Sequence, residues 1–348
     1  MTTSLAAQED DFAHPVNFVA RLQQLVATRP DDLALTVVSE RNGQLVETAL
    51  SYREFGVRVQ ALAAVLQQRF AAGDRLLILL DNDEHYAVSM FACFFAGVIA
   101  VPVFPPESTR PQHLARLGGI AADAQACGVL TAAAFLDLVN TAAKRFGSPV
   151  VVAVDQINPA DADNWNSHQP ISTDVAFLQY TSGSTSAPKG VMVTHGNLMA
   201  NERAIRERLE ITSADKFGVW SPLFHDMGLI GGLLQPFYSG IPCVLSSPRF
   251  FLERPVRWLQ LISRHRVTIS GGPDFAYRLC LDRISAAQLE ALDLSSWRVA
   301  YTGAEPVRHD TMDAFIERYV PVGFSAGAVY PCYGLAEATL LVTGGRRG

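Results

Sequence analysis

The sequence has little of what marks nucleic-acid-binding or disulfide-rich proteins. Only three of its 348 residues are lysine, the net charge is −6 and no long basic block occurs, so a nucleic-acid partner is not indicated. The five cysteines are odd in number and widely spaced, without a C-x-x-C pair. They predict reduced thiols and a cytoplasmic setting instead of a disulfide framework or a zinc site.

No segment of the sequence is suited to cross a bilayer. The longest apolar stretch, near residues 86–103, is interrupted by Ser89, Gly97 and Pro102 and is too short to span a membrane. Residues 1–11 are polar and acidic and lack the apolar core of a secretion signal. We therefore expect no membrane insertion.

What the sequence does contain is an alternation of apolar runs and helical patterns, which is typical of parallel sheets covered by helices. In the clearest unit, a strand at 75–80 precedes a helix that Asp83 caps and Gly97 ends, and a strand follows at 98–103. With 49% hydrophobic residues a sizeable core is expected. The pattern predicts an α/β fold with lobes near residues 50–212 and 213–348, and with residues 1–49 packed on the second lobe.

A run of hydroxyl residues with one glycine and one lysine stands between two apolar segments. It reads YTSGSTSAPKG over residues 180–190. Hydroxyls, backbone amides that glycine frees to turn toward an anion, and a lysine can contact a polyphosphate together. The run is not the P-loop pattern, because Pro188 precedes the lysine and no Ser or Thr follows it. Its composition also fits a solvated Ser/Gly connector, but the flanking strands favour a phosphate site.

Three further motifs follow in order: SPLFHDMG at 221–228, YTGAEP at 301–306 and YGLAEAT at 333–339. Together with the loop they resemble the adenylate-forming superfamily of acyl and aryl ligases, and most of all its fatty acyl-AMP ligases, over roughly residues 15–348. The resemblance implies an acyl-CoA synthetase-like N-terminal domain, with two lobes of parallel-rich sheets and helices on both faces. The family's barrel subdomain and mobile C-terminal domain have no counterpart in the sequence, so we expect residues 1–348 to be an incomplete AMP-binding domain with weak or no adenylation activity.

The resemblance also implies ATP and Mg²⁺ as cofactors, and it assigns roles to the motif residues. Lys189 would contact the β- and γ-phosphates, and His225 would lie between the carboxylate and the α-phosphate. Tyr333 would stack on adenine. The implied set is catalytic His225, Lys189 and Glu337, with Glu337 also the metal ligand; phosphate-binding Thr181, Ser182, Gly183, Ser184, Thr185 and Lys189; adenine-binding Gly303, Ala304, Glu305, Pro306, Tyr333 and Gly334; and acyl-binding Asp226, Met227 and Gly228.

Taken singly, several of these residues have a plainer interpretation. A lone histidine such as His225 is more often structural, and Pro306 fits the opening of a helix after a strand. Glu337 fits a helix first-turn acid stabilised by the dipole, and Tyr333 a half-buried core aromatic. Asp226 is interpreted as a helix cap or as an orienting partner for His225.

The implied reaction converts a fatty acid and ATP into acyl-adenylate and pyrophosphate, for transfer to the phosphopantetheine thiol of an acyl carrier protein. Catalysis would rest on positioning and charge neutralisation, without a covalent enzyme nucleophile. Apolar stretches at 227–237 and 267–277 are expected to line the acyl tunnel. Ser186 and Ala187 stand where the family usually has Gly, which makes positive φ costlier in the loop. A fatty acyl-CoA ligase, and a non-catalytic nucleotide-binding or scaffold fragment of a polyketide or peptide synthase loading module, remain as alternatives.

Overall fold

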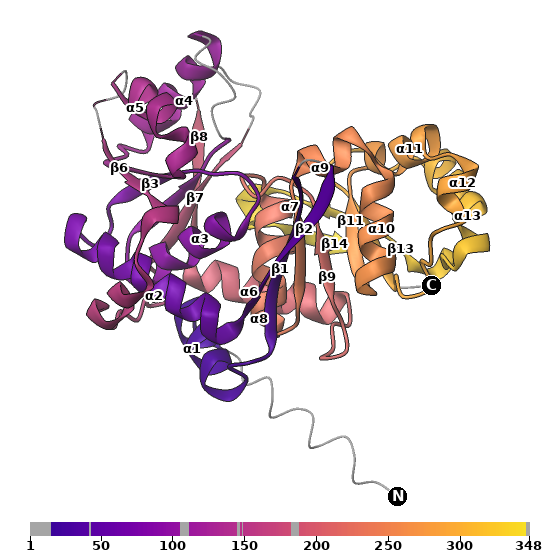
Figure 1. Ribbon diagram of the computed structural model, residues 1–348, viewed down its shortest axis with the longest axis horizontal. Coiled ribbons are helices and arrows are strands. Elements are labelled where there is room, and N and C mark those ends of the chain that lie inside the picture. Colours follow the sequence, from indigo (N-terminus) through magenta and orange to yellow (C-terminus); the bar gives the residue numbers. More distant parts are fainter. Residues whose placement is uncertain are drawn as a thin grey trace, which may run out of the picture.

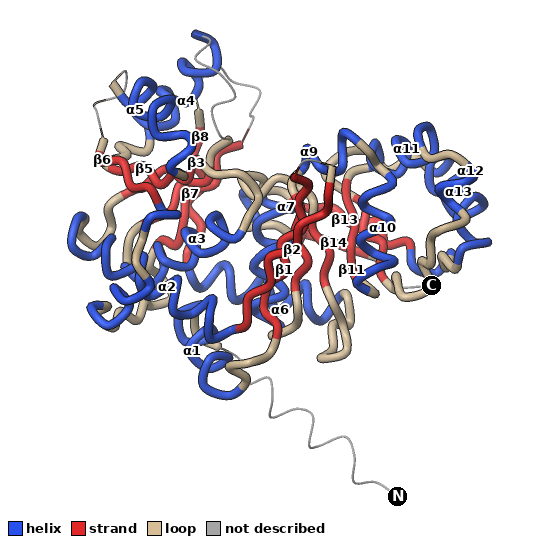
Figure 2. The backbone as a smooth tube through the Cα atoms, viewed as in Figure 1, coloured by secondary structure: helices blue, strands red, loops and turns tan. Residues whose placement is uncertain are grey.

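Two sheets form the framework of the protein (Figures 1 and 2). The computed structural model describes residues 15–41, 43–104, 111–144, 147, 149–181 and 188–345. The strands are β1 (Leu33–Arg41), β2 (Gln44–Ser51), β3 (Arg75–Leu79), β4 (Ile99–Pro102), β5 (Gly128–Thr131), β6 (Val150–Ala153), β7 (Val175–Thr181), β8 (Lys189–Thr194), β9 (Phe217–Val219), β10 (Cys243–Ser246), β11 (Ile269–Gly272), β12 (Val299–Thr302), β13 (Val329–Gly334) and β14 (Leu341–Gly344).

The smaller sheet has the order β6-β5-β3-β4-β7-β8 and the larger β14-β13-β12-β11-β9-β10-β1-β2. All pairings are parallel except β8 on β7, β2 on β1 and β14 on β13. Each of these antiparallel pairs contains an edge strand. The parallel-rich α/β architecture that the sequence predicts is therefore confirmed.

Helices cover both faces of each sheet. They are α1 (Phe18–Thr28), α2 (Tyr52–Arg69), α3 (Glu84–Ala96), α4 (Pro111–Asp123), α5 (Leu136–Ala143), α6 (His195–Arg208), α7 (Asp226–Gly228), the π-helical η5 (Leu229–Leu234), α8 (Gln235–Ser239), α9 (Pro248–Glu253), α10 (Val256–His265), α11 (Asp274–Arg283), α12 (Ala286–Leu289), α13 (His309–Tyr319) and short 3₁₀ turns that include η8 (Ala336–Ala338).

One hydrophobic core joins the two sheets through a shared helical layer. Residues of α1, α2, α3, α6, η5 and α8 pack there against strands of both sheets. A second cluster lies under α10, α11 and α13 on the larger sheet. A third lies under α4 and α5 on the smaller sheet. The layers therefore alternate helix, sheet, helix, sheet and helix, and the lobes share their central helices.

Helix α3 shows how the sequence dictates this arrangement. Asp83 accepts hydrogen bonds from the backbone amides of His85 and Tyr86, and Gly97 ends the helix with a φ of 76°. Between these caps nearly every residue is buried. A helix that is apolar all round belongs in an interior layer, which is where α3 lies. In the part of the chain that the structure describes, no helix combines the length and apolarity needed to cross a membrane.

The sequence interpretation misplaced one helix start. Pro306 does not open a helix: α13 begins at His309, and residues 303–308 form a loop. Asp274 at the start of α11 fixes this loop, because its Oδ1 accepts from the Arg308 backbone amide at 2.8 Å and its Oδ2 accepts from Thr311 Oγ1 at 3.1 Å. These long-range bonds, which propensity does not encode, decide where the helix starts.

Candidate active site

All four motifs follow the carboxyl ends of strands, or begin within them. Residues 180–190 begin in β7, 221–228 follow β9, 301–306 leave β12 and 333–339 leave β13. Parallel α/β sheets bind ligands at this edge, where loop amides and helix N-termini are exposed. Side chains of the smaller sheet's lobe reach the backbone of 221–224, so the two edges meet.

The phosphate-loop motif lies partly outside the described residues. Its predicted ligands Ser182, Gly183, Ser184 and Thr185 fall in the undescribed stretch, while Thr181 and Lys189 are the paired last residues of the β7–β8 ladder. Lys189 is exposed at the base of the loop.

A tyrosine anchors the base of this loop. Tyr180 Oη donates to Asp123 Oδ2 at 2.5 Å and so ties β7 to α4. Burial, followed by this carboxylate, raises the pKa of Tyr180. The tyrosine therefore stays protonated as a donor at neutral pH.

His225 and Asp226 form a polar pair at the start of α7. Their Nδ1 and Oδ1 atoms lie 2.8 Å apart, and Asp226 Oδ1 also accepts from the Met227 amide at 2.7 Å. The hydrogen bond that the imidazole donates to the Asp226 carboxylate raises the pKa of His225, against the lowering effect of burial. Because Nδ1 faces both Asp226 Oδ1 and, at 3.3 Å, the Met227 amide, Nε2 is the ring atom left to face a ligand. The side chain of His225 is 51% exposed, which a structural core histidine would not be.

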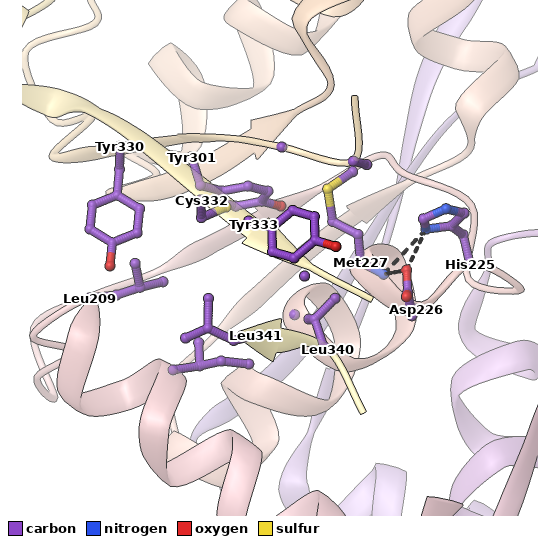
Figure 3. A pocket seen from close by; sticks show the side chains of 15 residues that line it. Leu209, His225, Asp226, Met227, Tyr301, Tyr330, Cys332, Tyr333, Leu340 and Leu341 are labelled. Carbon is purple, nitrogen blue, oxygen red and sulfur yellow. Dashed lines mark hydrogen bonds and ion pairs between the residues drawn. The ribbon is translucent and has the colours of Figure 1, made fainter. Parts of the chain in front are cut away.

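A cavity of about 180 Å³ begins beside this pair (Figure 3). His225 and Asp226 lie at one end, and Tyr330 and Leu209 lie toward the other. The lining joins residues of three motifs to residues of β13 and η5 and to apolar residues at the end of α6 and the start of β14: Ile205, Leu209, His225, Asp226, Met227, Gly231, Tyr301, Gly303, Ala304, Tyr330, Cys332, Tyr333, Gly334, Leu340 and Leu341. A polar mouth and an apolar interior suit an amphipathic ligand.

The strand end at 303–306 is shaped for close approach. A Cβ on Gly303 would lie 2.7 Å from the Cys332 carbonyl oxygen, so only glycine fits between β12 and β13. Ala304 has a φ of 66°, a conformation uncommon outside glycine. The two residues line the cavity, but Glu305 and Pro306 do not. Glu305 instead accepts from the Phe275 amide at 2.7 Å.

The motif at 333–339 forms a tight, strained loop. Thr339 has φ 73° and ψ −66°, and the Leu340 amide donates to the Ala338 carbonyl at 3.0 Å, which together define a γ-turn of the rare, strained kind. Tyr333 is 58% exposed, so it is not the half-buried core aromatic of the plainer interpretation. It leans over the mouth of the cavity (Figure 3). Strain of this sort concentrates at functional sites.

Glu337 is the magnesium ligand that the sequence predicts. It is exposed on η8 and does not line the cavity. Within the described residues, no three or more His, Cys, Asp or Glu side chains are grouped so that they could hold a metal ion. A single carboxylate fits Mg²⁺, which takes one or two protein carboxylates and completes its shell with water and substrate phosphates.

Sequence reasoning missed the far wall of the cavity. This wall consists of Ile205 in α6, Leu209 at its C-cap, and the neighbouring residues Leu340 and Leu341. Their spacing in the sequence is the same as that of ordinary core residues. Conversely, of the expected tunnel stretches, 227–237 contributes Met227 and Gly231 whereas 267–277 contributes nothing to this cavity.

Packing separates the second stretch from this cavity. The Tyr301 backbone and ring pack directly on Gly271, and the Trp220 ring packs on Gly272. These residues separate β11 from the cavity. The five cysteines are free; among them Cys332 lines the cavity, and burial raises the pKa of its thiol to about 11. It is therefore a neutral wall residue and not a nucleophile.

Comparison with known proteins settles the family. A sequence model described as AMP-binding enzyme matches residues 22–347. The chain belongs to this family of AMP-binding enzymes. The membership that the four motifs suggested is confirmed.

This AMP-binding enzyme is 44% identical over 313 residues to the medium-chain-fatty-acid–[acyl-carrier-protein] ligase JamA of Moorena producens, with 88% of the chain and 53% of JamA covered. It matches a fatty acid AMP ligase of Legionella pneumophila with a TM-score of 0.90 and 36% identity, over 99% of this chain and 58% of that one. A fatty acyl-adenylate ligase from L. pneumophila in complex with acyl adenylate and pyrophosphate gives a TM-score of 0.89 and 37% identity, over 97% and 58%. The chain thus spans little more than half the length of these relatives.

Proposed function

We propose that the protein to which this chain belongs activates a fatty acid with ATP, giving acyl-adenylate and pyrophosphate, and hands the acyl group to the phosphopantetheine thiol of an acyl carrier protein in the cytoplasm. One observation carries the proposal. A single cavity joins the His225–Asp226 pair to the nucleotide motifs at 303–304 and 333–334 and continues between apolar side chains. The relatives named as fatty acid ligases support the same substrate class.

In this mechanism the carboxylate of the fatty acid lies at the mouth of the cavity and its chain lies along Met227, Gly231 and Leu340. Asp226 orients the imidazole of His225 and favours its charged form. The imidazolium then offsets the repulsion between carboxylate and α-phosphate by placing a positively charged donor between the two anions. Tyr333 covers adenine beside Gly303 and Ala304.

The remaining polar residues would hold the polyphosphate. Lys189, Thr181 and residues 182–185 bind its outer oxygens, and Glu337 holds Mg²⁺, which supplies charge neutralisation when bound. With the cavity wall free of a reactive nucleophile, the reaction needs only that the two substrates are held in line.

Equilibrium binding tests the proposal. A non-hydrolysable sulfamoyl analogue of octanoyl-adenylate should bind the chain in calorimetry, and at one hundred times its Kd it should add about 2.7 kcal/mol to the free energy of unfolding. Tyr333→Ala should weaken binding by about tenfold or more, since a stacked base contributes roughly 1–3 kcal/mol. Lys189→Ala should weaken binding of pyrophosphate but not of the analogue.

Gln67→Leu serves as the control, because Gln67 bonds the backbone of Asn166 away from the cavity. Absence of binding to the wild-type chain would favour a scaffold role. Thioester formation on coenzyme A instead of a holo acyl carrier protein, measured with the intact protein, would identify an acyl-CoA ligase.

A further inference from the structure

The backbone that carries His225 is held by side chains from the opposite lobe. Strand β9 ends at Val219, so residues 221–224 have no neighbouring strand to bond. Asn82, in the turn between β3 and α3, takes that place from the smaller sheet's lobe. Its Nδ2 donates to the Ser221 carbonyl at 2.8 Å, and its Oδ1 accepts from the Leu223 amide at 3.0 Å.

Two more side chains of the smaller sheet's lobe form hydrogen bonds to the same segment. Tyr86 Oη donates to the Leu223 carbonyl at 2.8 Å, and Gln179 Nε2 donates to the Phe224 carbonyl at 2.9 Å. All three donors are buried: Asn82 is 7% exposed, Tyr86 0% and Gln179 2%. The bonds of Asn82 and Tyr86 are buried and that of Gln179 is partly buried, and together they fix both ends of the segment.

Gln179 has a second connection that Asn82 lacks. It lies in β7, two residues before Thr181, where the strand leads into the phosphate-loop motif. Phe224, whose carbonyl it binds, directly precedes His225. One amide therefore links the strand that leads into the phosphate loop to the residue directly before His225.

The fold alone does not require this link. Asn82 and Tyr86 already join the lobes, and the shared core buries the helices between the sheets. A glutamine amide buried with its Oε1 unpaired among the described residues carries a cost that an apolar side chain would avoid. A role of the bond in the reaction would account for a glutamine at this position.

We propose that Gln179, assisted by Asn82, is a positioning residue that sets His225 relative to the strand leading into the phosphate loop. The imidazole and the bound polyphosphate are thereby held in one geometry, and a shift of β7 shifts His225 with it. This inference rests on the proposed function for its catalytic meaning, and on the described contacts for its structural part.

The test pairs Gln179→Met, which keeps the length but cannot donate, with the control Gln67→Met. NMR titration of the histidine imidazoles, with His225 assigned from its loss in His225→Ala, should show the pKa of His225 moving toward its ordinary value in Gln179→Met. The control should leave it unchanged. The Asp226 contact depends on the backbone that Gln179 fixes, so a looser backbone weakens that contact.

Kinetics of the intact protein supply the second readout. Gln179→Met should lower kcat for adenylate formation about tenfold or more, because small misplacement of a reacting group is costly, while KM for ATP changes by less than about threefold. In a His225→Ala background the same change should have no further effect, since Gln179 acts through His225.

The outcomes of these experiments test the positioning role of Gln179 separately from the proposed function. Additive losses in the double variant, or an unaltered titration of His225, would overturn the positioning role. A wild-type protein that makes no adenylate would defeat the proposed function, while the titration still decides whether Gln179 sets His225. If Gln179→Met does not fold, Asn82→Asp, which loses the donor to Ser221 and keeps the acceptor for Leu223, must shift the His225 titration in the same direction; no shift would again overturn the role.

Discussion

If the proposed function is correct, filling the cavity at Gly231 should shorten the fatty acid that the protein accepts. Gly231 lies in the π-helical segment η5 and lines the cavity. A Cβ there would meet only Leu340 Cδ2, at 3.0 Å, which is the movable end of a flexible side chain. Gly231→Val can therefore be accommodated, and its added carbons project into the space of about 180 Å³.

The size of the effect follows from the volume displaced. Three added carbons exclude at most about three methylenes of the substrate, and each buried methylene contributes about 0.8 kcal/mol. The longest accepted acid should then lose up to roughly 60-fold in kcat/KM, or about fourfold for each methylene excluded. Shorter acids, which do not reach Gly231, should keep their activity.

The assay is pyrophosphate release by the intact protein over a series of saturated acids. Leu340→Ala should shift the preference the other way, toward longer acids, because it enlarges the same cavity. Gly118→Val is the control, since a Cβ at Gly118 on α4 meets open space. An equal loss at every chain length, or a shift toward longer acids in Gly231→Val, would refute the assignment of this cavity to the acyl chain.

Two further predictions concern stability. His195 is 3% exposed, and burial lowers its pKa from 6.5 to about 4. Between these two pH values the unfolded chain binds a proton at this residue and the folded chain does not. As pH falls from 6.5 to 4, the free energy of unfolding should therefore decrease by about 3 kcal/mol because of His195. His195→Phe, which keeps the ring contact with Phe94 at 5.2 Å, should remove that part of the pH dependence in urea denaturation at pH 7, 5.5 and 4.5, and an unchanged profile would contradict the argument. Thr339→Gly should raise the free energy of unfolding by about 1 kcal/mol, because relief of about 1–3 kcal/mol of backbone strain exceeds the added entropy of an unfolded glycine; a clear loss of stability would show that the threonine side chain matters more than the strain.

Much of the candidate site could be predicted from the sequence because its residues lie within short, contiguous motifs. The strand before each motif is an apolar run, and the residues that follow it take their position from the strand end. This is why His225, Gly303 and Tyr333, about 110 residues apart from first to last, line one cavity. Thr339 shows the limit: nothing in its residue type predicts a positive φ, which β-branched side chains disfavour.

The hydrogen bonds of Asn82 and Gln179 lay beyond sequence reasoning for a different reason. Each joins residues far apart in the chain, 139 for Asn82 to Ser221 and 45 for Gln179 to Phe224. A buried asparagine or glutamine must find partners, but its residue type does not say which backbone groups these will be. The same holds for Asp274, which binds the loop before α13.

The sequence by itself determined the alternation of strands and helices, the caps of α3 and the placement of four chemical motifs, because each depends on neighbouring residues and on the period of apolar side chains. Only the tertiary structure decided which apolar residues became the wall of the cavity and which became plain core. Leu340 and Val267 are alike as sequence, yet one faces the cavity and the other packs in the core beneath the outer helices of the larger sheet. Burial against a distant partner, not residue type, draws that distinction.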